Sequence, residues 1–84
     1  MKLSALPNIG KETARQLEEV GIHDAEELSM IGSKEAWLRI KTSIDPGACI
    51  HLLYGIEAAV EGIKKKDLSN EKRAELKEFY QLNE

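Results

Sequence analysis

The sequence predicts an all-α protein, a compact bundle of five to six short helices. Apolar residues recur at intervals of three and four along most of the chain, which is the spacing of amphipathic helices. No segment shows the apolar–polar alternation of a half-buried strand. The two prolines and several of the six glycines fall where the apolar spacing breaks, so they separate the helices. A chain of 84 residues, 42% of them hydrophobic, can bury one modest core, and residues 1–84 are predicted to form a single domain.

The first predicted unit is a hairpin over residues 3–20. Its clear helix is Lys11–Val20, in which Ala14 and Leu17 share one face. Gly21 follows directly and is typical of the left-handed residue that ends a helix.

A second hairpin is predicted over residues 24–43. Asp24 is a good N-cap for a short helix that Gly32 ends. Ser33 is the N-cap candidate of the helix that follows. In that helix Trp37 shares a face with other large apolar residues, which favours a place in the core over a role in stacking on a base.

The longest apolar-rich stretch predicts a central helix at residues 49–63. It is apolar nearly all round, as in a helix with neighbours on every side. We expect Cys49 to be a buried, inert thiol, and Gly55 and Gly62 to lie where another backbone comes close. A last helix is predicted at residues 69–82, whose apolar stripe either folds back on the domain or contacts a second copy.

A short pattern occurs twice, 22 residues apart, and reads Leu-x-x-Ile-Gly-x-x-x-Ala. The matching positions are Leu6, Ile9, Gly10 and Ala14 in the first copy and Leu28, Ile31, Gly32 and Ala36 in the second. The pattern indicates a short helix, a tight turn and a second helix with a small residue where the pair crosses. The first copy is the stronger, so the second is described as degenerate.

The stretch Leu3–Leu17 closely resembles the helix-hairpin-helix motif, whose usual core is Leu-Pro-Gly-Ile-Gly-Pro-Lys-Thr-Ala. The chain up to about Leu68 is also similar to the C-terminal domain of the TfoX/Sxy competence regulators. The segments that carry this second resemblance are Leu6–Gly10, Glu19–Ile22, Ile31–Ala36, Pro46–Gly47 and Leu52–Glu57. The resemblance implies a helical domain of the helix-hairpin-helix group, which occurs alone or after a separate N-terminal domain and is linked to control of natural transformation.

In helix-hairpin-helix proteins that bind DNA, the hairpin amides and the start of the next helix face a backbone phosphate. Such contacts do not read the base sequence. By this resemblance the nucleic-acid-binding candidates are Asn8, Ile9, Gly10, Lys11, Thr13 and Arg15, with Lys34 after the second hairpin. Two positions depart from the motif. Asn8 replaces the first glycine, and Glu12 places a carboxylate in the first helical turn, where a phosphate would dock.

Two functions fit this sequence. The first is weak, sequence-independent contact with double-stranded DNA in a regulatory role. The second is a protein-interaction or homodimerisation module in which the hairpin is only structural. The net charge of -3 provides no general attraction to DNA, and residues 1–44 hold six basic and seven acidic side chains. The Lys64–Lys66 run is expected to be a solvated connection, and the alternative is contact with phosphate or an acidic partner.

No enzyme is predicted, because no cluster of nucleophile, acid and base is apparent. His23 and His51 are far apart in the chain and have no partner at metal-ligand spacing, so neither a metal nor another cofactor nor a small-molecule substrate is expected. One cysteine fits a reducing compartment. The chain also lacks a signal-peptide pattern and an apolar run long enough for a bilayer, so we expect a cytoplasmic protein without membrane contact.

Overall fold

The computed structural model describes all residues 1–84 and contains helices but no strands, which confirms the predicted all-α class. The structure has five α-helices and two short 3-10 helices, one before the first α-helix and one between the fourth and the fifth. In chain order the elements are η1 (Leu3–Ala5), α1 (Lys11–Glu19), α2 (Ala25–Ile31), α3 (Ser33–Ser43), α4 (Ile50–Glu61), η2 (Lys65–Asp67) and α5 (Asn70–Asn83).

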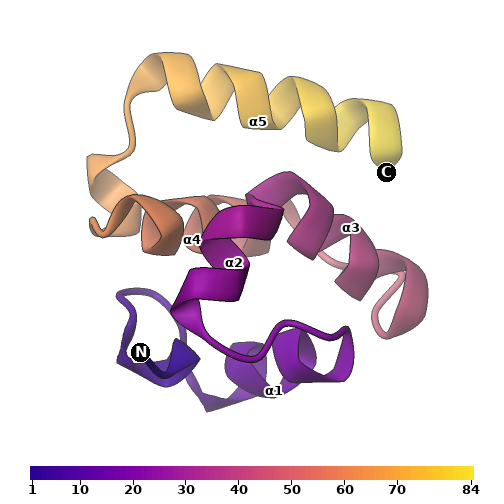
Figure 1. Cartoon of the computed structure of the whole chain (residues 1–84). Coiled ribbons are helices and arrows are strands. Elements are labelled where there is room, and N and C mark those ends of the chain that lie inside the picture. Colours follow the sequence, from indigo (N-terminus) through magenta and orange to yellow (C-terminus); the bar gives the residue numbers. More distant parts are fainter.

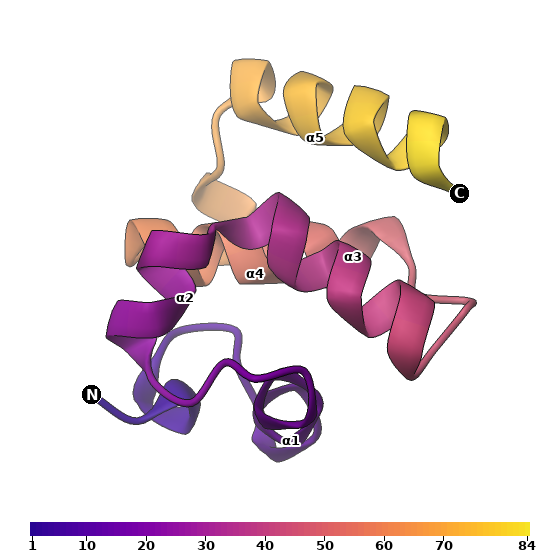
Figure 2. The ribbon, with the colours of Figure 1, turned by 45° about the vertical axis from the view of Figure 1, so that its right-hand side comes forward.

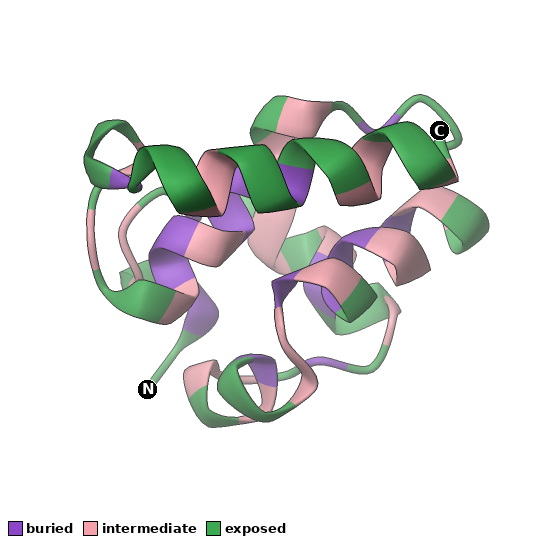
Figure 3. Cartoon of the chain, turned by 90° about the horizontal axis from the view of Figure 1, so that it is seen from above, coloured by how far each residue is buried: buried purple, intermediate pink, exposed green.

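The helices form three layers (Figure 1). η1 and α1 lie on one side, α2, α3 and α4 form the middle layer, and α5 crosses the opposite side. α4 packs against α2, α3, α5 and η2, so the apolar segment predicted as the central helix does lie in the centre. The outer face of α5 is largely exposed to solvent (Figure 3). None of the helices combines the length and the hydrophobicity needed to span a bilayer.

One continuous core of 16 buried apolar residues holds the layers together. Trp37 is completely buried in it, and its indole Nε1 donates a hydrogen bond of 3.1 Å to the carbonyl of Cys49. The Trp37 ring also meets Phe79 and Tyr80 of α5, with centroid distances of 6.0 and 5.6 Å. The predicted core role of Trp37 is therefore confirmed, and the apolar stripe of α5 folds back on the domain.

The helix ends follow the predicted signals in part. Asp24 caps α2 as predicted, because its carboxylate accepts a hydrogen bond of 2.8 Å from the N–H of Glu27. The prediction that Ser33 caps α3 is wrong. Gly32 is the N-cap, and Ser33 is the first helical residue, with a buried side chain whose hydroxyl donates to Glu57 instead.

Two predictions for α4 are also wrong. Cys49 is exposed rather than buried, because it is the N-cap residue and lies just outside the buried helix. Gly62 has no other segment near it; its φ of +74° ends α4 in the left-handed conformation. Gly55 does lie at a close approach, since a Cβ built there would be 3.8 Å from the Cβ of Asn8.

Candidate nucleic-acid interface

The N-terminal hairpin (residues 3–20) joins η1 to α1 through a tight turn. Figure 2 shows the loop after η1 rising towards α4, with α1 seen nearly end-on. Asn8 has a φ of +67°, the left-handed conformation that the glycine of the usual motif would supply. Gly10 is extended, with φ -88° and ψ -176°, and is the N-cap of α1. Asn8 rather than Gly10 therefore provides the unusual backbone conformation of this turn.

The start of α1 has four consecutive N–H groups that donate to no acceptor in the chain. They belong to Gly10, Lys11, Glu12 and Thr13. No side chain caps the helix either. Free N–H groups together with the positive end of the helix dipole favour an anion at this position.

The carboxylate of Glu12 does not fill this position. It turns along the helix to Arg15, with Oε1 3.0 Å from Nε and Oε2 2.5 Å from Nη2. Arg15 also pairs with Glu19 one turn further on. The hydrogen bond from Arg15 lowers the pKa of Glu12 below its ordinary value, and the hydrogen bond and charge of Glu12, aided by Glu19, raise the pKa of Arg15. The acidic side chain that departs from the motif is thus held by a cation, away from the amides.

The structure brings five of the seven candidate residues together in the hairpin turn: Asn8, Ile9, Gly10, Lys11 and Thr13. Lys11 is exposed and makes no ion pair. Arg15 lies one turn along α1, between two carboxylates. Lys34 does not join the hairpin, because it lies at the start of α3 with its Nζ 2.7 Å from Glu75.

Two of the five hairpin residues, Asn8 and Ile9, have side chains that are already engaged within the domain, and the N–H of Ile9 donates to the carbonyl of Leu6 at 3.4 Å. Ile9 is buried in the core. The side-chain amide of Asn8 reaches the segment after α4, where Nδ2 donates to the carbonyl of Ile63 at 2.9 Å and Oδ1 accepts from the N–H of Lys65 at 3.1 Å. Sequence reasoning missed Lys65 as a neighbour of the hairpin, because 57 residues separate it from Asn8. The run of three lysines, Lys64–Lys66, was the feature of the sequence that could have pointed to this cationic neighbour.

A groove of about 410 Å³ lies between the hairpin and the first turns of α4. Its walls come from Asn8, Ile9 and Thr13 of the hairpin, from Cys49, His51, Leu52, Gly55 and Ile56 at α4, and from Lys65. Polar and apolar residues from three separate segments line this groove. The hairpin, the start of α4 and the lysine run therefore share one depression in the surface.

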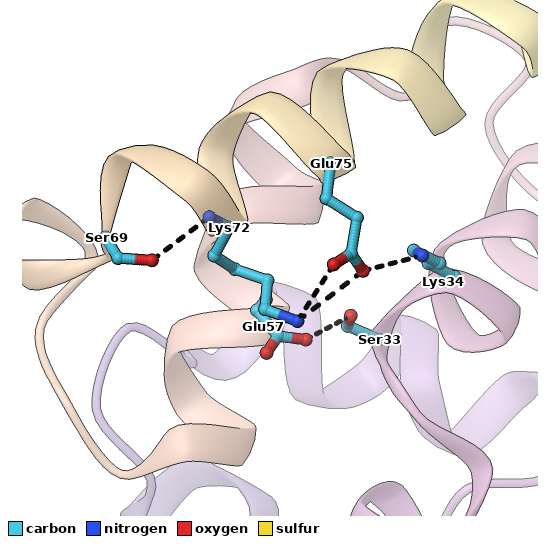
Figure 4. Close-up of polar contacts among 6 residues, drawn as sticks. All are labelled: Ser33, Lys34, Glu57, Ser69, Lys72 and Glu75. Atoms are coloured by element: carbon cyan, nitrogen blue, oxygen red, sulfur yellow. Dashed lines mark hydrogen bonds and ion pairs between the residues drawn. The ribbon is translucent and has the colours of Figure 1, made fainter.

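The second hairpin (residues 24–43) has a different environment at the start of α3 (Figure 4). The hydroxyl of Ser33 donates a hydrogen bond of 2.6 Å to Glu57 of α4. The ammonium of Lys34 lies 2.7 Å from Glu75 of α5. Carboxylates of α4 and α5 thus bind side chains of the first turn of α3, although the N–H groups of Ser33, Lys34 and Glu35 donate to no acceptor in the chain.

The sequence model of the TfoX C-terminal domain matches residues 1–80. The chain belongs to the TfoX C-terminal domain family. This confirms the resemblance to TfoX/Sxy, in a family of regulatory domains rather than a known family of enzymes. Protein Sxy of Escherichia coli (strain K12) is 33% identical over 78 residues, which cover 93% of this chain and 37% of Sxy. This TfoX C-terminal domain therefore spans little more than a third of that curated relative.

Two solved structures from Listeria monocytogenes have the same fold. One, described as an uncharacterized protein, is 45% identical with a TM-score of 0.95 and matches 98% of this chain and 92% of its own. The other, described as a protein of unknown function, is 46% identical with a TM-score of 0.93 and matches 98% of this chain and all of its own. The TfoX C-terminal domain therefore also occurs as a chain of about this length in those structures.

Proposed function

We propose that this chain is a non-enzymatic, cytoplasmic regulatory domain whose N-terminal hairpin binds a backbone phosphate of double-stranded DNA without reading the bases. Membership of the TfoX C-terminal domain family and the similarity to Sxy support a competence-regulator-like role. One observation carries the DNA-binding proposal. Glu12 is bound to Arg15, and the four amides from Gly10 to Thr13 have no partner in the chain.

The proposed contact combines hydrogen bonds from backbone N–H groups with the positive charge of one lysine. The amides at the start of α1 donate to the phosphate oxygens, and the helix dipole adds a partial positive charge. Lys11 supplies the full charge, because it is exposed and unpaired. Since no base edge is contacted in this arrangement, affinity depends on salt and hardly at all on DNA sequence.

The test is fluorescence anisotropy with a labelled duplex of about 20 base pairs, from about 50 to about 300 mM salt. We expect log affinity to fall linearly with log salt, with a slope of about -1 for each phosphate contact. Lys11→Glu should weaken binding at least about tenfold. The matched control is Lys77→Glu on α5, which changes the net charge equally at another exposed, unpaired lysine.

Absence of binding by the unaltered chain at the lowest salt would refute the proposal. Equal effects of Lys11→Glu and Lys77→Glu would also refute it, because binding would then follow net charge and not the hairpin. Either result would favour the alternative function, a protein-interaction module in which the hairpin is only structural.

A further inference from the structure

The second group of cations beside the hairpin is the run Lys64–Lys66, which the sequence alone presents as a solvated connection. In the structure this run leaves α4 and forms η2, and Asn8 of the hairpin binds its backbone on both sides of Lys64. The run therefore lies against the proposed phosphate-binding turn.

The backbone of this lysine turn is fixed from two directions. The N–H of Lys65 donates to Oδ1 of Asn8 at 3.1 Å, and the carbonyl of Lys65 accepts from Nη2 of Arg73 at 2.7 Å. Arg73 itself lies 5.3 Å from the centroid of the Tyr54 ring, and Leu68 at the end of the turn is buried. A turn held in this way needs little further ordering when it binds a ligand.

The lysine side chains are not neutralised by neighbouring carboxylates. Lys64, Lys65 and Lys66 make no ion pair within 4.0 Å, and Lys11 at the start of α1 makes none either. Lys64 and Lys66 are exposed, and Lys65 is half-buried in the wall of the groove.

The nearby acidic residues offset this cationic group only in part. Glu12 is bound to Arg15, whereas Glu61 at the end of α4 makes no ion pair. Asp67, within the turn itself, is the carboxylate that remains without a partner there. The turn thus holds three unpaired lysines beside two carboxylates without a cation partner, Asp67 and Glu61, in a chain whose net charge is -3.

We propose that Lys64, Lys65 and Lys66 form a second phosphate-binding element, so that the backbone of a DNA duplex passes from the hairpin to the lysine turn. This inference rests on the proposed function of the hairpin and extends it. Asn8 acts as a positioning residue, because its side chain holds the lysine turn against the hairpin. Two adjoining elements fix the direction of the duplex on the domain, which one phosphate contact does not.

The experiment uses the same duplex and salt series with Lys64→Glu and Lys66→Glu, and with Lys77→Glu as the control of equal charge. We expect each turn variant to weaken binding about fivefold or more and to lower the magnitude of the salt slope by about 0.9. Lys64→Arg and Lys66→Arg should bind like the unaltered chain. Circular dichroism and thermal unfolding check that the exposed substitutions preserve the fold.

A further variant tests the positioning role. Asn8→Gly keeps a residue that readily adopts positive φ but removes both hydrogen bonds to the lysine turn. We expect weaker binding with all lysines present, and a normal far-UV spectrum. Unchanged affinity in this variant would overturn the positioning role.

The outcomes separate this inference from the proposed function. If Lys11→Glu weakens binding and both turn variants match Lys77→Glu, the hairpin proposal stands and the lysine turn is not a contact. If the unaltered chain does not bind the duplex, both proposals fail.

Discussion

The two hairpins share a sequence pattern but differ at the start of their second helices. In the N-terminal hairpin the amides from Gly10 to Thr13 have no partner, and the nearest carboxylate is turned to Arg15. In the second hairpin Glu57 accepts from the Ser33 hydroxyl, and Glu75 pairs with Lys34. The N–H groups of Ser33, Lys34 and Glu35 also donate to no acceptor, so the two copies differ in the carboxylates of α4 and α5 that bind side chains of the second one.

This difference arises from what packs on each hairpin. α3 of the second hairpin contacts α2, α4 and α5, so polar residues of α4 and α5 meet its first turn. α1 packs chiefly on η1 and α3, at the edge of the domain. Both hairpins contribute to the core, but the first turn of α3 meets α4 and α5, whereas α1 lies at the edge of the domain.

The largest expected effect comes from the core of the second hairpin. Trp37→Ala should lower the free energy of unfolding by about 4 kcal/mol. The Trp37 side chain is completely buried where α3 packs on α5, and it donates a hydrogen bond to the Cys49 carbonyl. Leu17→Ala in α1 should cost less, about 3 kcal/mol. Urea unfolding followed by circular dichroism measures both. A larger loss for Leu17→Ala would show that the N-terminal hairpin contributes more to the free energy of unfolding than the second hairpin.

The glycines at equivalent positions provide the next test. Gly32 has φ +88° and ψ 158°, a region open essentially to glycine alone, so Gly32→Ala should destabilise the domain by about 2 kcal/mol. Gly10 is extended with open space around it, and Gly10→Ala should cost only about 0.5 kcal/mol. Thermal unfolding of the two variants distinguishes them.

The effect of Gly10→Ala on DNA binding is a further test of the N-terminal hairpin. The methyl group of Gly10→Ala adds bulk next to the free amides, so this variant should lose affinity for the duplex while remaining folded. Full retention of affinity would show that the duplex does not approach the amides closely.

The smallest expected effect is a pH dependence of the second hairpin. Hydrogen bonds from Lys34 and Lys72 lower the pKa of Glu75 below its ordinary 4.5, so its stabilising contribution is present above about pH 4.5 and is lost as the pH falls through the lowered value. Glu75→Gln should therefore cost about 0.5 kcal/mol near neutral pH, since both partners are largely exposed, and almost nothing near pH 3. Urea unfolding at both pH values measures the difference.

Glu61 provides a control of opposite sign. Its pKa is raised above 4.5 by the hydrogen bond with Glu57, so the folded state is favoured by protonation and penalised when Glu61 is ionised. Glu61→Gln should stabilise the domain slightly near neutral pH, by about 0.5 kcal/mol or less, and the gain should vanish below about pH 4. The same sign for Glu61→Gln and Glu75→Gln would contradict this account of the acidic residues around α3.

Most of the fold could be predicted from local patterns. Apolar spacing placed all five helices, and Asp24 and Gly21 marked helix ends because capping depends on the nearest few residues. Ser33 and Cys49 were misjudged for a different reason. The burial of Ser33 depends on Glu57 in another helix, and the exposure of Cys49 depends on the residue at which α4 begins.

The candidate site was predictable only in its local part. The turn around Asn8 and Gly10 follows from a short motif, and the structure places those residues together. The direction of the Glu12 carboxylate was not predictable, because its choice between the amides and Arg15 depends on side-chain geometry. The pairing of Lys34 with Glu75 likewise depends on where α5 crosses α3.

By itself, therefore, the sequence determined the all-α class, the helices and the hairpin turn, since each depends on residues that are neighbours in the chain. Only the tertiary structure decided which hairpin meets carboxylates of α4 and α5 and that the Lys64–Lys66 run lies beside the other one. Both depend on contacts such as Asn8 with Lys65, and hydrogen bonds between residues 57 positions apart leave no periodic signal in the chain.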